Sequence, residues 1–134
     1  PRTHSDLLFK GAVRDTARSV YTGLIHIKPN AAHSQAFQTN RNLTLSEGAW
    51  AESVPNLEIE TNEVKCSHAS TVGSVDEDQK FYLESRGVPP EIAERLIVFG
   101  FFNEVIDRLP KAADVESLRA AVNHKLNPEG DVAQ

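Results

Sequence analysis

Two patterns of hydrophobic and polar positions divide the chain. Between Asp6 and Val75, short apolar runs alternate with polar residues, and Gly, Asn and Pro separate the runs. A period of two is typical of a β-strand that buries one face. Leu57 and Ile59, each followed by a glutamate, show this period most clearly. The first half of the chain is therefore predicted to consist of β-strands.

The predicted strands cover residues 7–9, 19–27, 36–45 and 56–61, and the segment around Cys66 has the same extended character. Irregular loops join these strands, and no strict repeat length is evident. Such a series fits either a β-sandwich or an open parallel solenoid, and the periodicity does not distinguish these two folds.

The second half of the chain has the period of helices. The predicted helices cover residues 76–86, a stretch from Pro90 to before Pro110, and residues 113–126. Asp76 suits the N-cap of the first helix, and Gly87 suits its end because glycine adopts the left-handed conformation at low cost. Strands followed by helices, without alternation, disfavour a Rossmann-like fold. No phosphate-binding glycine motif occurs either, so the chain itself is not expected to bind ATP.

Composition and charge describe an ordinary globular domain with an acidic second half. The 134 residues are 40% hydrophobic and 25% charged. Residues 1–70 carry seven basic and seven acidic side chains, whereas residues 71–134 carry seven and twelve. The negative excess argues against nucleic acid as a partner. It favours either a protein partner with a basic surface or helices whose acidic side chains simply face solvent.

The use of cysteine indicates the compartment. Cys66 is the single cysteine, so an intrachain disulfide is excluded and a reducing cytoplasm is the simplest location. No apolar run is long enough for a membrane span, so membrane insertion is not expected. Pro1 and the lack of methionine suggest that the chain is a fragment of a longer protein.

Cys66 and His68 are the candidate metal ligands. They lie two residues apart in a strand-like segment, so their side chains should point to the same side, with α-carbons about 6.5 Å apart. Two ligands do not complete a cluster or zinc site, which usually needs four, so any metal must be shared with another chain or held transiently. The alternative is that Cys66 is a small buried apolar residue and His68 a polar residue at a strand end.

A hydrolase is disfavoured. No G-x-S-x-G string surrounds Ser67 or Ser70, and Ser67 should point away from the neighbouring His68. The remaining histidines form no motif with His68 and are predicted to lie on the surface; they are His4, His26, His33 and His124.

Seven ordered segments resemble the C-terminal portion of SufD proteins, members of the SufB/SufD family of iron–sulfur cluster assembly scaffolds. The segments cover residues 5–11, 21–25, 38–43, 55–59, 64–68, 71–73 and 81–87. Most informative is Lys65-Cys66-Ser67-His68, the K-C-S-H motif. The resemblance extends over nearly all of residues 5–110.

The resemblance implies a mainly β fold followed by α, namely the end of a right-handed parallel β-helix with a C-terminal helical domain. Residues 1–75 would then form the last turns of the β-helix. Residues 76–127 would form the helical domain that contacts the SufC ATPase, and residues 128–134 a frayed tail. Relatives are often described as components of an ABC-type system because they associate with SufC.

The resemblance also implies a non-catalytic scaffold subunit that pairs with SufB through the β-helix. His68 would contribute to a transient, nascent iron–sulfur cluster shared with SufB, and Cys66 would be a secondary ligand. A nucleophilic SufB cysteine aligns with Asn40, so this chain lacks that thiol and is SufD-like. ATPase activity is expected in SufC, and flavin only in the full complex.

Three further expectations concern the alternative function, self-association and the aromatic residues. The alternative function is a purely structural module of the complex that does not contact iron. An isolated fragment should form a homodimer that covers its open β-helix end. The aromatic residues of the helices are predicted to be core rather than partner contacts; they are Phe81, Phe99, Phe101 and Phe102.

Overall fold

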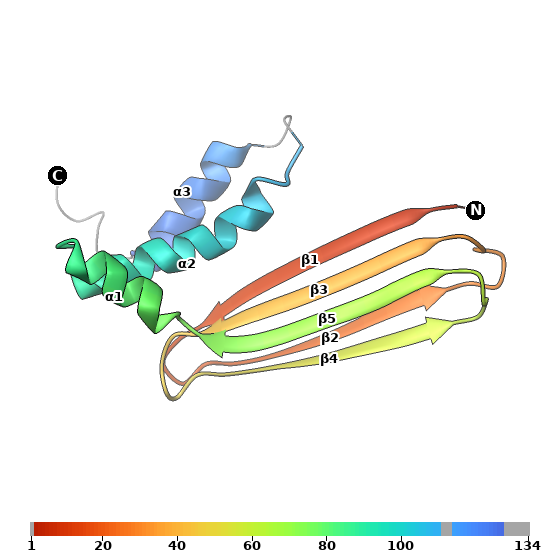
Figure 1. Cartoon of the computed structure of the whole chain (residues 1–134), viewed down its shortest axis with the longest axis horizontal. Coiled ribbons are helices and arrows are strands. Elements are labelled where there is room, and N and C mark those ends of the chain that lie inside the picture. Colours follow the sequence, from red (N-terminus) through yellow and green to blue (C-terminus); the bar gives the residue numbers. More distant parts are fainter. Residues whose placement is uncertain (1, 111–113, 128–134) are drawn as a thin grey trace. The chain divides into compact units, whose positions relative to one another are not determined.

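Two compact units make up the chain, a β unit of residues 1–74 and a helical unit of residues 75–134. The computed structural model describes residues 2–110 and 114–127 (Figure 1). The predicted frayed tail, residues 128–134, lies outside the described part of the chain.

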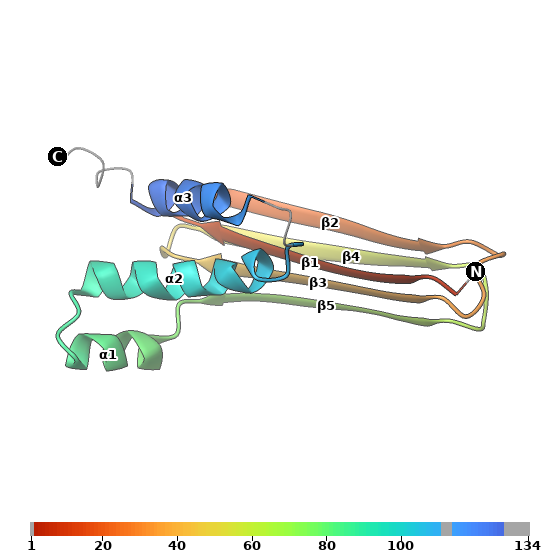
Figure 2. The same ribbon diagram turned by 90° about the horizontal axis from the view of Figure 1, so that it is seen from above.

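Five parallel-paired strands form the β unit. They are β1 (His4–Val13), β2 (Arg18–Ile27), β3 (Gln35–Thr44), β4 (Trp50–Ile59) and β5 (Lys65–Ser74). One sheet has the order β1-β3-β5, and the other pairs β2 with β4. The arrows of the first sheet point one way and those of the second point the other way (Figure 1). The chain therefore passes back and forth between two sheets, each of which gains a strand at every second crossing (Figure 2).

The strand pairing reveals a repeat that the sequence pattern did not show. His4 pairs with Gln35, 31 residues later, and Gln35 pairs with Lys65, 30 residues later. In the other sheet, Arg18 pairs with Trp50. Because the loops differ in length and the side chains in type, this repeat of about thirty residues is regular in space and irregular in sequence.

Residues that alternate along each strand face the space between the two sheets. Ile25, Ile27 and Ala51 supply its buried apolar part. On β3 the residues of this inner face are largely polar, and Gln38 and Asn42 are buried. The interior of the β unit is therefore a mixture of aliphatic and amide side chains, which must be hydrogen-bonded to offset their burial.

Two contacts stabilise the buried amides. Asn42 Nδ2 donates a hydrogen bond of 2.7 Å to Asn40 Oδ1, and Gln38 Nε2 donates one of 2.7 Å to the Tyr21 hydroxyl. Gly23 leaves the room that Gln38 occupies, because a Cβ atom there would stand 1.8 Å from Nε2 of Gln38. A larger residue at position 23 would therefore displace the end of the Gln38 side chain.

The predicted strands are confirmed in type but not in length. The strand predicted at 7–9 extends over His4–Val13, and the one predicted at 56–61 begins earlier, at Trp50. Pro55 made the earlier start difficult to see, since proline usually marks the end of a strand. It is tolerated because β4 is paired with a single strand, β2, within the described residues.

Three helices follow. They are α1 (Glu77–Ser85), α2 (Pro90–Ile106) and α3 (Val115–Leu126), close to the predicted ranges. Asp76 accepts hydrogen bonds from the backbone of Asp78 and Gln79, which confirms it as the N-cap of α1, and Gly87 has the expected positive φ of 87°. Within the described residues, no helix has the length and apolar character required to cross a membrane.

The core of the helical unit is small. Val75, Ala93, Val98 and Ile106 are its buried apolar residues. The prediction that Phe81 belongs to the core is wrong, because 71% of this residue is exposed. The apolar stripe that suggested burial is therefore a surface of α1. The other three phenylalanines of the prediction are partly buried.

Hydrogen bonds from one arginine side chain connect α3 to the end of α2. Arg119 donates from Nη1 to Asn103 Oδ1 and, at 2.7 Å, from Nη2 to Asp107 Oδ1. Asp107 is the C-cap of α2, so this side chain joins the last turn of one helix to the middle of the next.

Candidate functional site

The segment that carries the two candidate ligands is the last strand of the β unit. Strand β5 pairs with β3 along its whole length. Within the described residues β5 has no strand on its other side, so it is an edge of the three-stranded sheet. Most of its residues are exposed. An exposed edge strand offers backbone hydrogen-bonding groups and side chains to a second chain.

Register places Cys66 and His68 on the face that continues the interior of the β unit. Cys66 pairs with Ala36, and His68 pairs with the buried Gln38. Paired residues of parallel strands point to the same side of the sheet, so both candidate ligands continue the inner face. Cys66 is half-buried and His68 is exposed. The predicted same-side placement of the two residues agrees with this register.

The thiol of Cys66 is less acidic than a free thiol. Desolvation by burial raises the pKa of Cys66. A raised pKa keeps the group in its thiol form, whereas both nucleophilic attack and metal binding require the thiolate. In the chain as described, burial thus favours the protonated form of Cys66.

Cys66 and His68 do not by themselves make a complete metal site. No group of three or more His, Cys, Asp and Glu side chains that could hold a metal ion occurs among residues 2–110 and 114–127. A sulfur and an imidazole nitrogen on one face do match the ligand chemistry of iron–sulfur clusters. These residues therefore fit a cluster only as a substrate whose remaining ligands come from elsewhere.

Asn40 lies in the interior of the β unit. It is buried on β3 and pairs with Ser70 of β5, one inner-face position beyond the pair that contains His68. Its Oδ1 accepts the hydrogen bond from Asn42. This position thus carries a hydrogen-bonded amide close to the row of His68, and it holds no thiol in this chain.

Among the described residues of the β unit, the other histidines form no metal-binding group with His68. His26 lies on the outer face of β2, as predicted, and its Nε2 is 2.5 Å from Oε1 of Glu60. His33 adopts a positive φ of 63° in a turn and is 3.2 Å from Glu63. His4 lies on β1 with its ring beside Phe37, at a centroid distance of 5.9 Å. Ser67 pairs with Phe37 on the outer face, so it cannot serve His68 as a nucleophile.

The buried amide beside His68 was missed by the sequence interpretation. Gln38, Asn40 and Asn42 alternate along β3, and alternating polar residues usually indicate the solvent face of a strand. Here they are the buried face. One signal could have revealed this burial. The three amides alternate in step with Ala36, a small apolar residue at the start of the inner face of β3.

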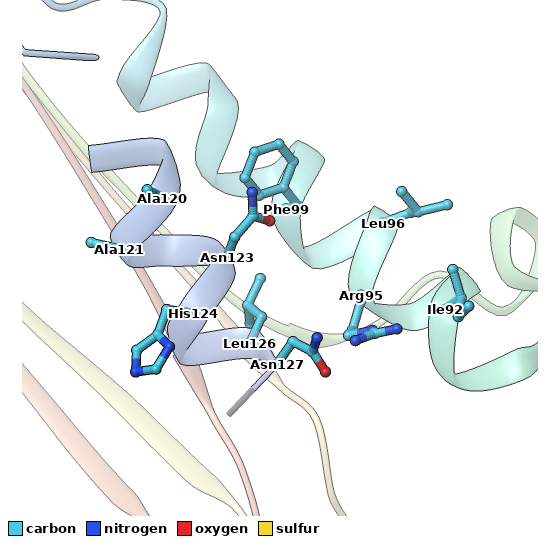
Figure 3. A pocket seen from close by; sticks show the side chains of 10 residues that line it. All are labelled: Ile92, Arg95, Leu96, Phe99, Ala120, Ala121, Asn123, His124, Leu126 and Asn127. Atoms are coloured by element: carbon cyan, nitrogen blue, oxygen red, sulfur yellow. The ribbon is translucent and has the colours of Figure 1, made fainter. Parts of the chain in front are cut away.

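A groove marks the surface of the helical unit. It lies between α2 and α3 and has a volume of about 840 Å³ (Figure 3). Leu96 and Phe99 contribute its apolar wall from α2, and Ala120 with Ala121 leaves space on α3. Half of the Leu96 side chain is exposed. The groove has the size and character of a site for an apolar side chain or helix of another protein.

Comparison with known proteins identifies the family. Residues 1–101 match the family model described as "SUF system FeS cluster assembly, SufBD core domain". A SufBD family iron–sulfur cluster assembly protein of Mycobacterium leprae is 45% identical, over 94% of this chain and 34% of its own length. SufD of Bacillus subtilis is 38% identical over 90% of the chain, and SufD of Escherichia coli is 35% identical over 92%; these alignments cover 28% and 29% of the two SufD proteins.

The chain therefore belongs to the SufB/SufD family of iron–sulfur cluster assembly proteins, as its motifs predicted. It spans about a third of the length of the curated relatives it matches. The matched family is described as one of iron–sulfur cluster assembly.

Proposed function

We propose that this chain is part of a SufD-like scaffold subunit that shares a nascent iron–sulfur cluster with SufB. The observation that carries the proposal is the placement of His68 and Cys66 on the inner face of the edge strand β5. An incomplete pair of ligands at an open edge suits a cluster that forms between two chains. Edge pairing with SufB would bring the missing ligands to it.

The β unit is proposed to be the end of a right-handed parallel β-helix. Strands that alternate between two parallel sheets with a repeat of about thirty residues support this fold. The first turn of the described chain would then stack on preceding turns of the longer protein. The last turn, with β5, would be left open for a partner.

The imidazole of His68 suits a temporary site. A neutral imidazole is a weaker ligand for iron than a thiolate and leaves more readily. The raised pKa of the Cys66 thiol points in the same direction, because protonation competes with metal binding. A scaffold of this kind, located in the cytoplasm, would release its cluster to an acceptor rather than retain it.

The helical unit is proposed to dock the SufC ATPase. Its exposed apolar surface, formed by Phe81 on α1 and by Leu96 in the groove, supports a protein contact. The acidic charge of residues 71–134 would complement a basic surface on the partner. ATP hydrolysis in SufC would then supply the energy for rearranging the shared site.

Replacement of the imidazole tests the shared site. In a complex reconstituted from the full-length protein, SufB and SufC, His68→Ala should lower cluster yield at least severalfold because one ligand of the site is lost. His26→Ala is the matched control, since His26 is an exposed strand histidine on the outer face. An undiminished yield with His68→Ala would remove this residue from the site.

The alternative function is a structural module that holds SufB and SufC without contacting iron. The half-buried thiol and the two-ligand set are also compatible with this role. Iron-edge X-ray absorption of the assembled complex distinguishes the two. A nitrogen scatterer that disappears in His68→Ala supports the shared site, and identical spectra support the structural module.

A further inference from the structure

The groove between α2 and α3 is basic although the helical unit around it is acidic. Among the described residues that line the groove, Arg95 and His124 have basic side chains, and none is Asp or Glu. Residues 71–134 as a whole carry twelve acidic and seven basic side chains. The groove is therefore a local site for negative charge on a unit whose net charge is negative.

Arg95 is a charged group of this groove without a partner in the described fold. Its side chain is half-buried and lines the groove together with apolar residues. Within residues 2–110 and 114–127, its guanidinium makes no hydrogen bond or ion pair, whereas Arg108 and Arg119 of the same unit are paired with carboxylates. A partly buried guanidinium loses hydration, and here no ion pair offsets that loss. Arg95 is thus ready to accept a carboxylate from another chain.

The apolar wall of the groove adjoins this charge. Ile92, Leu96 and Phe99 lie within one turn of Arg95 and line the groove with it from α2 (Figure 3). Half of Leu96 is exposed, so the helical unit leaves this wall partly uncovered. Arg95 and Phe99 are separated by about 6 Å along the helix axis, given the rise of an α-helix. An occupant that uses both needs a carboxylate and an apolar side chain about one helical turn apart.

We propose that the groove binds an apolar segment of SufC that also carries a carboxylate, and that Arg95 selects this carboxylate. A planar guanidinium can donate two parallel hydrogen bonds to a carboxylate, and a lysine cannot. The inference rests on the proposed docking of SufC and adds the surface and the chemistry of the contact. An acidic group of SufC enters the groove, while its basic surface meets the acidic residues outside.

Charge reversal at position 95 separates this contact from the effect of overall charge. In the full-length protein, Arg95→Glu should weaken SufC binding about tenfold, because two carboxylates would then meet in a partly desolvated contact. If overall charge alone governed binding to a basic surface, the same variant would bind more tightly, because it makes the helical unit more acidic. Titration calorimetry with purified SufC measures the dissociation constants.

Three further variants define the contact. Lys125→Glu makes the same change of charge at an exposed residue of α3 outside the groove lining, and it should not weaken binding. Arg95→Lys keeps the charge without the guanidinium fork and should weaken binding about threefold. Ala121→Trp fills the groove, leaves its charges in place and should weaken binding as Arg95→Glu does. Circular dichroism checks that each variant is folded, and Leu96→Gln replaces Ala121→Trp if the latter is not.

The outcomes distinguish the inference from the proposed docking. Unchanged or tighter binding of Arg95→Glu, with the wild-type protein bound to SufC, overturns the inference and leaves the docking proposal in place. Equal weakening by Lys125→Glu and Arg95→Glu also overturns it, since the position of the charge would then not matter. Absence of binding by the wild-type protein overturns the docking proposal itself. Weaker binding of Arg95→Glu and Ala121→Trp, but not of Lys125→Glu, supports the inference.

Discussion

At the scale of single residues, the two candidate ligands differ in environment although they share a face. His68 is exposed at the open edge, whereas Cys66 is partly covered and its pKa is raised. Spacing in the sequence was enough to predict the shared face, because side chains of a strand alternate strictly. It did not predict the difference in burial, which depends on contacts with other strands of the β unit.

The environment of Cys66 makes its reactivity testable. Alkylation of the folded chain by iodoacetamide should be slower than that of a free thiol near pH 8, since burial lowers the thiolate fraction there. The midpoint of the rate against pH should lie higher for the folded chain than for the chain unfolded in urea. Alkylation quenched at successive times and followed by mass spectrometry measures both midpoints, and Cys66→Ser provides the blank.

An equal midpoint in the folded and unfolded chains would contradict the effect of burial. A lower midpoint in the folded chain would go further, because it would show an activated thiolate at this position. Cys66 would then become the primary ligand candidate in place of His68.

At the scale of elements, two glycines of the helical unit illustrate opposite constraints. Gly100 is inside α2, and a Cβ there would meet nothing within 4 Å. Gly87 also has open space around it, but its φ of +87° is strained for any other residue. The space for an added side chain is thus equal at the two positions, and only their backbone conformations differ.

Gly100→Ala is expected to stabilise the helical unit by about 0.5–1 kcal/mol, because glycine is a poor residue inside a helix. Gly87→Ala should destabilise the unit by about 1–2 kcal/mol through its left-handed conformation. Urea unfolding of the chain, followed by circular dichroism at a helix band, measures the two changes. Loss of stability in Gly100→Ala would show that α2 needs the glycine for contacts inside the free chain.

At the scale of the whole molecule, the β unit has an open end. Leu57, Ile59 and Val72 belong to its inner face near this end, yet 39–46% of each is exposed. The edges β1 and β5 add unpaired backbone within the described residues. Exposed apolar side chains beside a free strand edge favour association with another chain.

The chain by itself is therefore expected to form a dimer that covers this end. Val72→Glu should shift light-scattering mass toward the monomer, because a carboxylate would be buried in the contact. Thr71→Glu is the control on the outer face of the same strand, where the change should have little effect. A monomer at high concentration in the wild-type chain would contradict the proposed association surface.

The order of elements and the helix boundaries followed from the sequence alone. Asp76 and Gly87 bracket α1 because capping and left-handed termination are local effects, and seven ordered segments together were enough to identify the family. The alternation of β5 placed its two candidate ligands on one side for the same local reason.

Only the tertiary structure decided the rest. The thirty-residue repeat became visible through the register of strands far apart in the chain, since pairing conserves position in space rather than residue type. Gln38 proved to be buried beside His68 because Gly23 and Tyr21 on the opposite sheet make room and a hydrogen bond for it. Phe81 proved exposed because no other part of the described helical unit covers that face of α1. Such contacts depend on which elements meet, and no local pattern specifies that.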